Sequence, residues 1–181
     1  MGATVQQDLA IDFLEALNNI WAEQSGLFQV AETEELLPGL AQITIRWLAA
    51  TAREQVDRQR QDRGVRGGVQ WGAGDVQPSD AFLNRRDISL REALNRIVHA
   101  EPTWIFVQDR EVVLCWKYTP YYVSDSENDE PYCAYFLSAS LIAAVRRALY
   151  SEERRFHQVA ELEQKLRTES AYAGLLPHGT G

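Results

Sequence analysis

The sequence has little cysteine, lysine and histidine, and it lacks a long hydrophobic run. Cys115 and Cys133 are too few for the disulfide framework of a secreted domain, and their apolar surroundings predict buried free thiols. The longest apolar run, from 132 to 145, is shorter than the roughly 20 residues of a membrane span. A polar stretch follows Met1 where a signal peptide would be apolar. We therefore expect a cytoplasmic protein that makes no membrane contact.

Motifs for catalysis, metal binding and cofactor binding are also missing. No Ser or Cys lies in a nucleophile-elbow context, and no His-Glu pair has the spacing of a metalloprotease. The three histidines and two cysteines do not share a zinc-ligand spacing. The hydrophobic fraction of 45%, with five Trp, is nevertheless ample for a folded core. The sequence predicts a globular protein that is not an enzyme and holds no metal or cofactor.

The charge of the chain is uneven in sign and in residue type. The formal net charge is −8, and of the 18 basic residues only Lys117 and Lys165 are lysine, which leaves 16 arginines. A negative charge opposes non-specific binding to nucleic acid and suits a basic protein partner. Many proteins without such a partner are equally acidic, and codon usage also enriches arginine. The charge therefore favours a basic partner without requiring one.

Hydrophobic periodicity predicts a helical N-terminal part over residues 1–63. Two helices are expected there, over 4–24 and 40–62. The first half of the second helix is apolar nearly all round, which predicts that it is buried. Residues 64–79 follow with five glycines and a proline, a composition typical of a linker or loop.

The C-terminal part, residues 80–170, begins with mixed structure. Ser89 and Glu92 form a capping box at the start of a helix with a regular apolar face. Strands over 103–108 and 112–117 are predicted to form an antiparallel hairpin. An extended segment near 80–88 would add a strand and complete a β-α-β-β unit.

Helical periodicity returns after the hairpin, over 134–150 and 152–169. Residues 171–181 are expected to be a flexible tail. The predicted fold is therefore α+β and helix-dominated. It has an N-terminal helical pair, then a helix with an antiparallel hairpin, then C-terminal helices, all packed as one compact unit.

An acidic, tyrosine-rich segment separates the hairpin from the C-terminal helices. Its alternating carboxylates resemble the start of a calcium loop, but Glu130 and Phe136 stand where that loop requires Gly and Glu. Tyrosine is enriched at protein interfaces, so the segment is interpreted as a docking surface for a basic protein. The candidate residues are Tyr121, Tyr122, Asp125, Glu127, Asp129, Glu130 and Tyr132.

Arginine, glycine and tryptophan occur together over residues 53–71. Such a segment can hold single-stranded nucleic acid through phosphate contacts and base stacking. Interleaved acids at helix-pair distances also fit an exposed helix end that runs into a loop. The candidate residues for nucleic acid are Arg58, Arg60, Arg63, Arg66 and Trp71.

Two functional hypotheses follow from these features. The first is a non-enzymatic protein-binding accessory factor, of the adaptor, chaperone, immunity or inhibitor type, that uses its acidic and aromatic surface. An apolar seam in the last predicted helix would allow this factor to form a homo-oligomer. The alternative is a nucleic-acid-associated accessory protein that uses residues 53–71.

Overall fold

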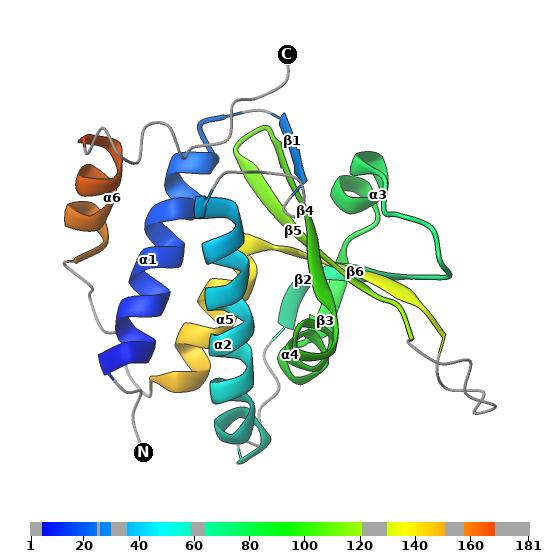
Figure 1. Ribbon diagram of the computed structural model, residues 1–181. Helices are drawn as coiled ribbons and strands as arrows, with labels where there is room; N and C mark the ends of the chain where they lie inside the picture. The colour runs from blue at the N-terminus through cyan, green and yellow to red at the C-terminus, as the bar shows by residue number, and fades with distance from the viewer. Residues whose placement is uncertain are drawn as a thin grey trace.

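A layer of helices covers one face of an antiparallel sheet in the computed structural model, which describes residues 5–24, 26–29, 36–58, 64–120, 130–150 and 158–168 (Figure 1). The helices are α1 (Val5–Trp21), α2 (Leu36–Arg58), α3 (Pro78–Leu83), α4 (Leu90–His99), α5 (Ser138–Leu149) and α6 (Gln158–Thr168). The strands are β1 (Gly26–Gln29), β2 (Gly64–Trp71), β3 (Arg86–Ser89), β4 (Glu101–Gln108), β5 (Glu111–Tyr118) and β6 (Tyr132–Leu137). The predicted α+β class is confirmed.

The strands of the described residues form one sheet in the order β1-β4-β5-β6-β2-β3, and every neighbouring pair is antiparallel. β4 and β5 are the predicted hairpin. Their connection contains Asp109 and Arg110, whose φ angles of 50° and 67° suit a tight two-residue turn. The predicted antiparallel hairpin is therefore present, with the turn at the predicted place.

The main hydrophobic core lies between the helical layer and the sheet. Trp21 of α1, Trp116 of β5 and Phe136 of β6 are among its largest fully buried side chains. The core extends from Ile11 to Leu166, so both sides of the glycine-rich segment contribute to it. Figure 1 shows α1, α2 and α5 on this side of the sheet and α3 on the other.

A smaller apolar cluster lies on the opposite face of the sheet, under α3. Ala81 of α3 packs there with Phe106, Tyr135 and the two cysteines. Cys115 and Cys133 are both buried free thiols, as the sequence predicted.

Helix α4 begins at the predicted cap. The amide of Glu92 donates to Ser89 Oγ at 3.0 Å, and Ser89 has the extended backbone of an N-cap residue. The helix buries Leu90, Leu94 and Ile97 on one face, so its other face is free to line the surface described below.

The glycine-rich segment 64–79 is not a linker over its first half. Residues 64–71 form β2, which lies between β6 and β3 inside the sheet. A Cβ atom on Gly67 would overlap the carbonyl oxygen of Tyr135, and one on Gly68 would overlap the ring of Tyr135. The glycines therefore allow a close approach of two strands, a role that composition alone does not separate from flexibility.

The predicted helix over 134–150 begins later than expected, because β6 occupies residues 132–137 and α5 starts at Ser138. β6 is buried along almost its whole length, and a short, continuously apolar run fits a buried strand and a buried helix equally well. The extended segment near 80–88 is also revised. It contains α3 and then β3, and β3 pairs with β2 and not with the hairpin.

The two outer helices also differ from expectation. The seam of α6 packs within the chain, because Val159, Leu162 and Leu166 join the main core and α6 lies beside α1 (Figure 1). The first half of α2 was predicted to be buried, but its outward face is exposed. Ile43 has the largest exposed fraction on this face, 64%. No helix of the described residues is long and apolar enough to cross a membrane.

Candidate functional site

Four side chains from four different elements meet where β2 and β5 end and β6 begins. They are Trp71 of β2, Arg96 of α4, Tyr118 of β5 and Tyr132 of β6, and we call them the aromatic–arginine cluster. Tyr132 is paired in register with Trp71 on one side and with Tyr118 on the other. The three rings therefore form one row across three adjacent strands, on the same face of the sheet.

The rings of this row are in direct contact. The Tyr118 and Tyr132 rings are stacked with centroids 5.1 Å apart, and the Trp71 and Tyr132 rings meet edge to face at 5.7 Å. Both arrangements are favourable for aromatic pairs. The rings hold one another in place, so the surface that they form is built before any ligand arrives.

Arg96 lies against two of these rings. Its guanidinium carbon is 4.7 Å from the Trp71 centroid and 4.6 Å from the Tyr132 centroid, within the range of a cation–π contact. Glu92, one turn earlier on α4, is 3.7 Å from the guanidinium. The hydroxyl of Tyr132 donates to the main-chain carbonyl of Arg96 at 3.3 Å. These contacts fix the orientation of Arg96 relative to the sheet.

Burial differs sharply along the row. Tyr132 is 5% exposed, whereas Trp71 at the end of β2 is 50% exposed. Burial raises the pKa of Tyr132, and the neighbouring guanidinium of Arg96 opposes that shift. Tyr132 is therefore the buried, uncharged side chain at the base of the cluster, and Trp71 is the part that a partner can reach.

Two cavities open beside the cluster. One of about 420 Å³ lies along the exposed face of α4, over Tyr132, and its lining includes Ser89, Asn95 and Arg96. The other, of about 280 Å³, lies beside Tyr118. His99 at the end of α4 lines both cavities, so they adjoin at this residue.

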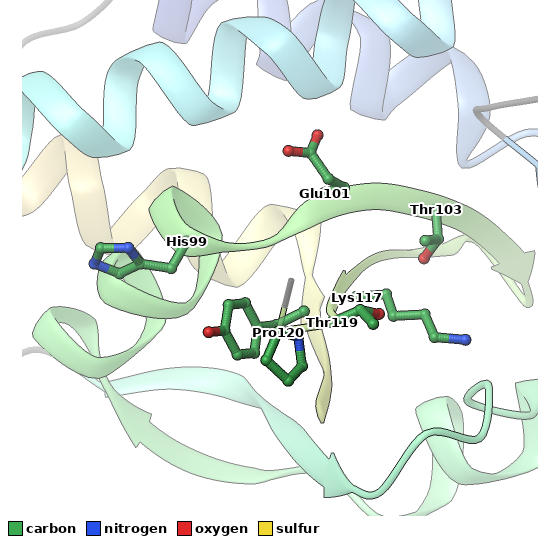
Figure 2. Close-up of a pocket in the computed structure, with 7 residues that line it drawn as sticks. His99, Glu101, Thr103, Lys117, Thr119 and Pro120 are labelled. Atoms are coloured by element: carbon green, nitrogen blue, oxygen red, sulfur yellow. The ribbon is translucent and has the colours of Figure 1, made fainter. Parts of the chain in front are cut away.

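The smaller cavity is built from the starts and ends of neighbouring elements. Figure 2 shows His99 from α4, Glu101 and Thr103 from β4, Lys117 from β5, and Thr119 and Pro120, which follow β5. The Glu101 carboxylate points toward α2, and the Lys117 side chain extends away in another direction. Neither charge is directed into the middle of the cavity.

The charged side chains around the cavities are mostly compensated. Glu101 accepts two hydrogen bonds from Arg46 of α2, both at 3.1 Å. Lys117 donates to Asp75 at 2.6 Å, and this hydrogen bond raises the pKa of Lys117. The surface therefore offers aromatic rings and polar groups more than net charge. That combination suits a segment of polypeptide better than a small ion.

The structure brings together two residues that the sequence had assigned to rival hypotheses. Tyr132 was a candidate for protein binding and Trp71 for nucleic acid, and the two rings are in contact. Glu130 is exposed, two residues before Tyr132. The other candidates of the acidic segment lie outside the described residues: Tyr121, Tyr122, Asp125, Glu127 and Asp129.

The arginine candidates do not gather around Trp71. Arg66 lies toward the other end of β2, about 17 Å away at the rise of an extended strand, and it is 3.7 Å from Asp87. Its amide donates to Ser140. Arg58 is the last residue of α2, while Arg60 and Arg63 lie outside the described residues. The described members of this arginine set therefore do not form a continuous basic groove.

Arg96, Tyr118 and His99 were not predicted as site residues. Arg96 lies on the polar face of a well-predicted helix, and Tyr118 is the last residue of a well-predicted strand. The available signal was the presence of aromatic residues at the ends of three strands, at 71, 118 and 132. It could not be used because neither β2 nor β6 was recognised as a strand.

The described residues contain no group of three or more His, Cys, Asp or Glu side chains that could hold a metal ion. Burial raises the pKa of both cysteine thiols. Comparison of the chain with protein-family models, with curated proteins and with solved structures finds no match. The aromatic–arginine cluster and its two cavities are therefore interpreted from their geometry alone.

Proposed function

We propose that this protein is a non-enzymatic protein-binding accessory factor, and that a partner docks on the aromatic–arginine cluster and the two cavities beside it. The observation that carries the proposal is the half-exposed indole of Trp71, held in a preformed row of rings with Arg96 against it. Trp, Tyr and Arg are the residues that most often dominate binding energy at protein interfaces.

The rigidity of the cluster supports this role. Rings and a guanidinium that already contact one another lose little conformational freedom when a partner binds. The two adjoining cavities give a partner segment room on both sides of His99. An extended segment of a partner could therefore contact Trp71 and fill both cavities.

The sequence next to the cluster favours a basic partner. The connection between Tyr118 and Tyr132 contains four acidic residues, at 125, 127, 129 and 130, and no basic residue. A negative connection beside an aromatic anchor would attract a cationic segment and raise its association rate. The adaptor, chaperone, immunity and inhibitor types all remain within this proposal.

The test is affinity capture with the tagged protein from lysate of its own source, quantified by mass spectrometry. Partners that dock on the cluster should be retained by the wild type and lost with Trp71→Ala. The matched control is Leu83→Ala, which truncates an apolar side chain that is 80% exposed on α3, away from the cluster. Equal capture by wild type and Trp71→Ala, or equal loss with Leu83→Ala, would refute the proposal.

Nucleic-acid binding through residues 53–71 is the alternative function, and the protein purified for affinity capture also tests it. A nucleic-acid-binding protein would carry co-purifying nucleic acid, and its binding would weaken steeply with salt. We expect neither, because Arg66 lies far from Trp71 along β2 and is close to Asp87.

A further inference from the structure

The row of rings in the aromatic–arginine cluster has two accessible ends and a buried middle. Trp71 at one end is 50% exposed and Tyr118 at the other end is partly exposed, whereas Tyr132 between them is 5% exposed. A partner segment that follows the row therefore contacts two aromatic side chains, one on each side of Tyr132. The inference below rests on the proposed function, because it names the kind of segment that this same surface binds.

The direction of the row excludes one common way of binding a peptide. Trp71, Tyr132 and Tyr118 face one another in register on three adjacent strands, so the row runs across these strands. A peptide that extends a sheet lies along an edge strand and forms a ladder of main-chain hydrogen bonds with it. A segment that follows this row crosses the strands and forms no such ladder.

The lining of the larger cavity argues against a helix as the partner segment. A helix that binds in a groove places an apolar stripe against an apolar surface. Apart from Tyr132, the cavity of about 420 Å³ is lined instead by polar and charged side chains, from Ser89, Arg91, Glu92, Asn95, Arg96 and His99. An apolar stripe placed over them would remove water from these polar groups without giving them hydrogen-bond partners, which costs free energy.

The polar groups beside the exposed indole are hydrogen-bond donors. Within the described part of the chain, the Trp71 side chain interacts only through its ring, with Tyr132 and Arg96, and its indole N–H has no acceptor. The guanidinium of Arg96 carries several N–H donors, and the Glu92 carboxylate lies 3.7 Å from one of its nitrogens. This part of the surface therefore fits a segment that presents free acceptors.

The distance between the two exposed rings matches one turn of a polyproline II helix. Trp71 and Tyr118 lie two strands apart, and neighbouring strands are separated by about 4.8 Å, so the two positions are about 10 Å apart. A polyproline II helix has three residues per turn and a rise of about 3.1 Å, so residues i and i+3 share a face about 9 Å apart. Two prolines at this spacing can each contact one ring.

We infer that the partner segment is proline-rich and binds as a polyproline II helix, with prolines at i and i+3 against Trp71 and Tyr118. Its main-chain carbonyls form no hydrogen bonds within the helix, so they are available to the Trp71 indole and to Arg96. Proline has no N–H, so such a segment brings acceptors without donors that would need partners of their own. The polyproline II helix is also formed before binding, which lowers the entropy cost of docking.

The test compares two fluorescein-labelled peptides of about ten residues, or about three turns of polyproline II. Both have the same composition, three prolines among alanine and glutamine, and no charged side chain, so the net charge of the protein does not decide between them. In the first peptide successive prolines are three residues apart. In the second they are two residues apart, so that no pair matches the two rings. Fluorescence anisotropy should show the first peptide binding at least about tenfold more tightly.

Variants place the binding on the chain. Trp71→Ala should weaken binding of the first peptide at least about tenfold, because it removes one of the two rings. Trp71→Phe keeps a ring but removes the indole donor, so it should weaken binding about two- to tenfold, the effect of one hydrogen bond. Leu83→Ala, at a side chain of α3 that is 80% exposed, is the matched control and should bind like the wild type. Circular dichroism of each variant verifies that the fold is retained.

The indole N–H of Trp71 gives a second measurement. Its proton–nitrogen NMR cross-peak is assigned as the one that is missing from Trp71→Phe. This cross-peak should move when the first peptide is added, because the N–H gains an acceptor. The cross-peaks of Trp21 and Trp116, whose side chains are fully buried, should stay in place.

Three results would overturn the inference: no binding of the first peptide, equal binding of both peptides, or unchanged binding by Trp71→Ala. Affinity capture tests the proposed function separately. A captured partner that is lost with Trp71→Ala, together with no binding of either peptide, would refute the polyproline II segment and leave the proposed function in place.

Discussion

Replacing Gly67 with alanine tests whether the glycine-rich segment is a strand of the sheet or a flexible linker. In a linker, Gly→Ala is neutral or stabilises the protein by about 0.4–1 kcal/mol, because it restricts the unfolded chain. In β2, the new methyl group of Gly67→Ala would overlap the carbonyl oxygen of Tyr135 and also meet Phe136. The two interpretations therefore predict opposite signs for the change in the free energy of unfolding.

The size of the effect follows from what the methyl group meets. A main-chain carbonyl within a sheet cannot rotate away, so the cost belongs at the upper end of the about 1–3 kcal/mol of an overpacked site. After the gain from the unfolded chain, the net loss is about 2 kcal/mol. For a chain of this length, that loss lowers Tm by about 4–8 °C. Gly68→Ala meets the end of the Tyr135 ring, which can shift, so its loss should be smaller.

The assay is thermal and urea unfolding followed by circular dichroism, with Gly64→Ala as the matched control. Gly64 lies in the same strand, but the nearest atom to its added Cβ would be Asp87 Cβ at 3.8 Å, an ordinary contact. Gly64→Ala should therefore leave stability unchanged or raise it slightly. A Gly67→Ala variant as stable as Gly64→Ala would refute the placement of β2 against β6.

Three further predictions concern single side chains. Ser89→Ala should lower the free energy of unfolding by about 1 kcal/mol in urea titrations, because it removes the N-cap of α4. Burial raises the pKa of Asp12 above its usual value near 3.8, against the opposing effect of Arg146. The folded protein thus keeps this proton to a higher pH than the unfolded chain. The free energy of unfolding of the wild type, relative to that of Asp12→Asn, should therefore fall as the pH rises from near 3.8 through the raised pKa, and stay constant above it. Urea midpoints of both proteins, measured across this pH range, test the expectation. Cys115 and Cys133 should react with a thiol reagent much more slowly in the native protein than in urea, because both thiols are buried and burial raises their pKa. Rapid labelling of the native protein would contradict their buried positions.

The parts of the fold that the sequence predicted depend on local signals. α4 begins directly after Ser89, because the Ser89 hydroxyl accepts from the amide three residues later and caps the helix. The β4–β5 hairpin turns within two residues. β2 and β6 depend on each other instead, through Gly67 and Gly68 against Tyr135. No local pattern reveals that contact, because its partners are more than sixty residues apart in the sequence. The glycines therefore resembled a linker, and the apolar run that contains Tyr135 resembled a helix.

The candidate site was missed in part for the same reason. Trp71 and Tyr132 were each recognised, but they were assigned to different functions because their strands were not recognised as neighbours. Once β2 and β6 are paired, the two rings fall into one row, and Arg96 joins them from α4. The combination of residues, more than any one of them, makes this surface a candidate for binding.

The outer face of α2 shows the complementary difficulty. Composition correctly gives a helix with apolar residues nearly all round, but which of them are covered depends on the other elements of the fold. Ile43 and Ile45 are two residues apart and equally apolar, yet the first is 64% exposed and the second 4%.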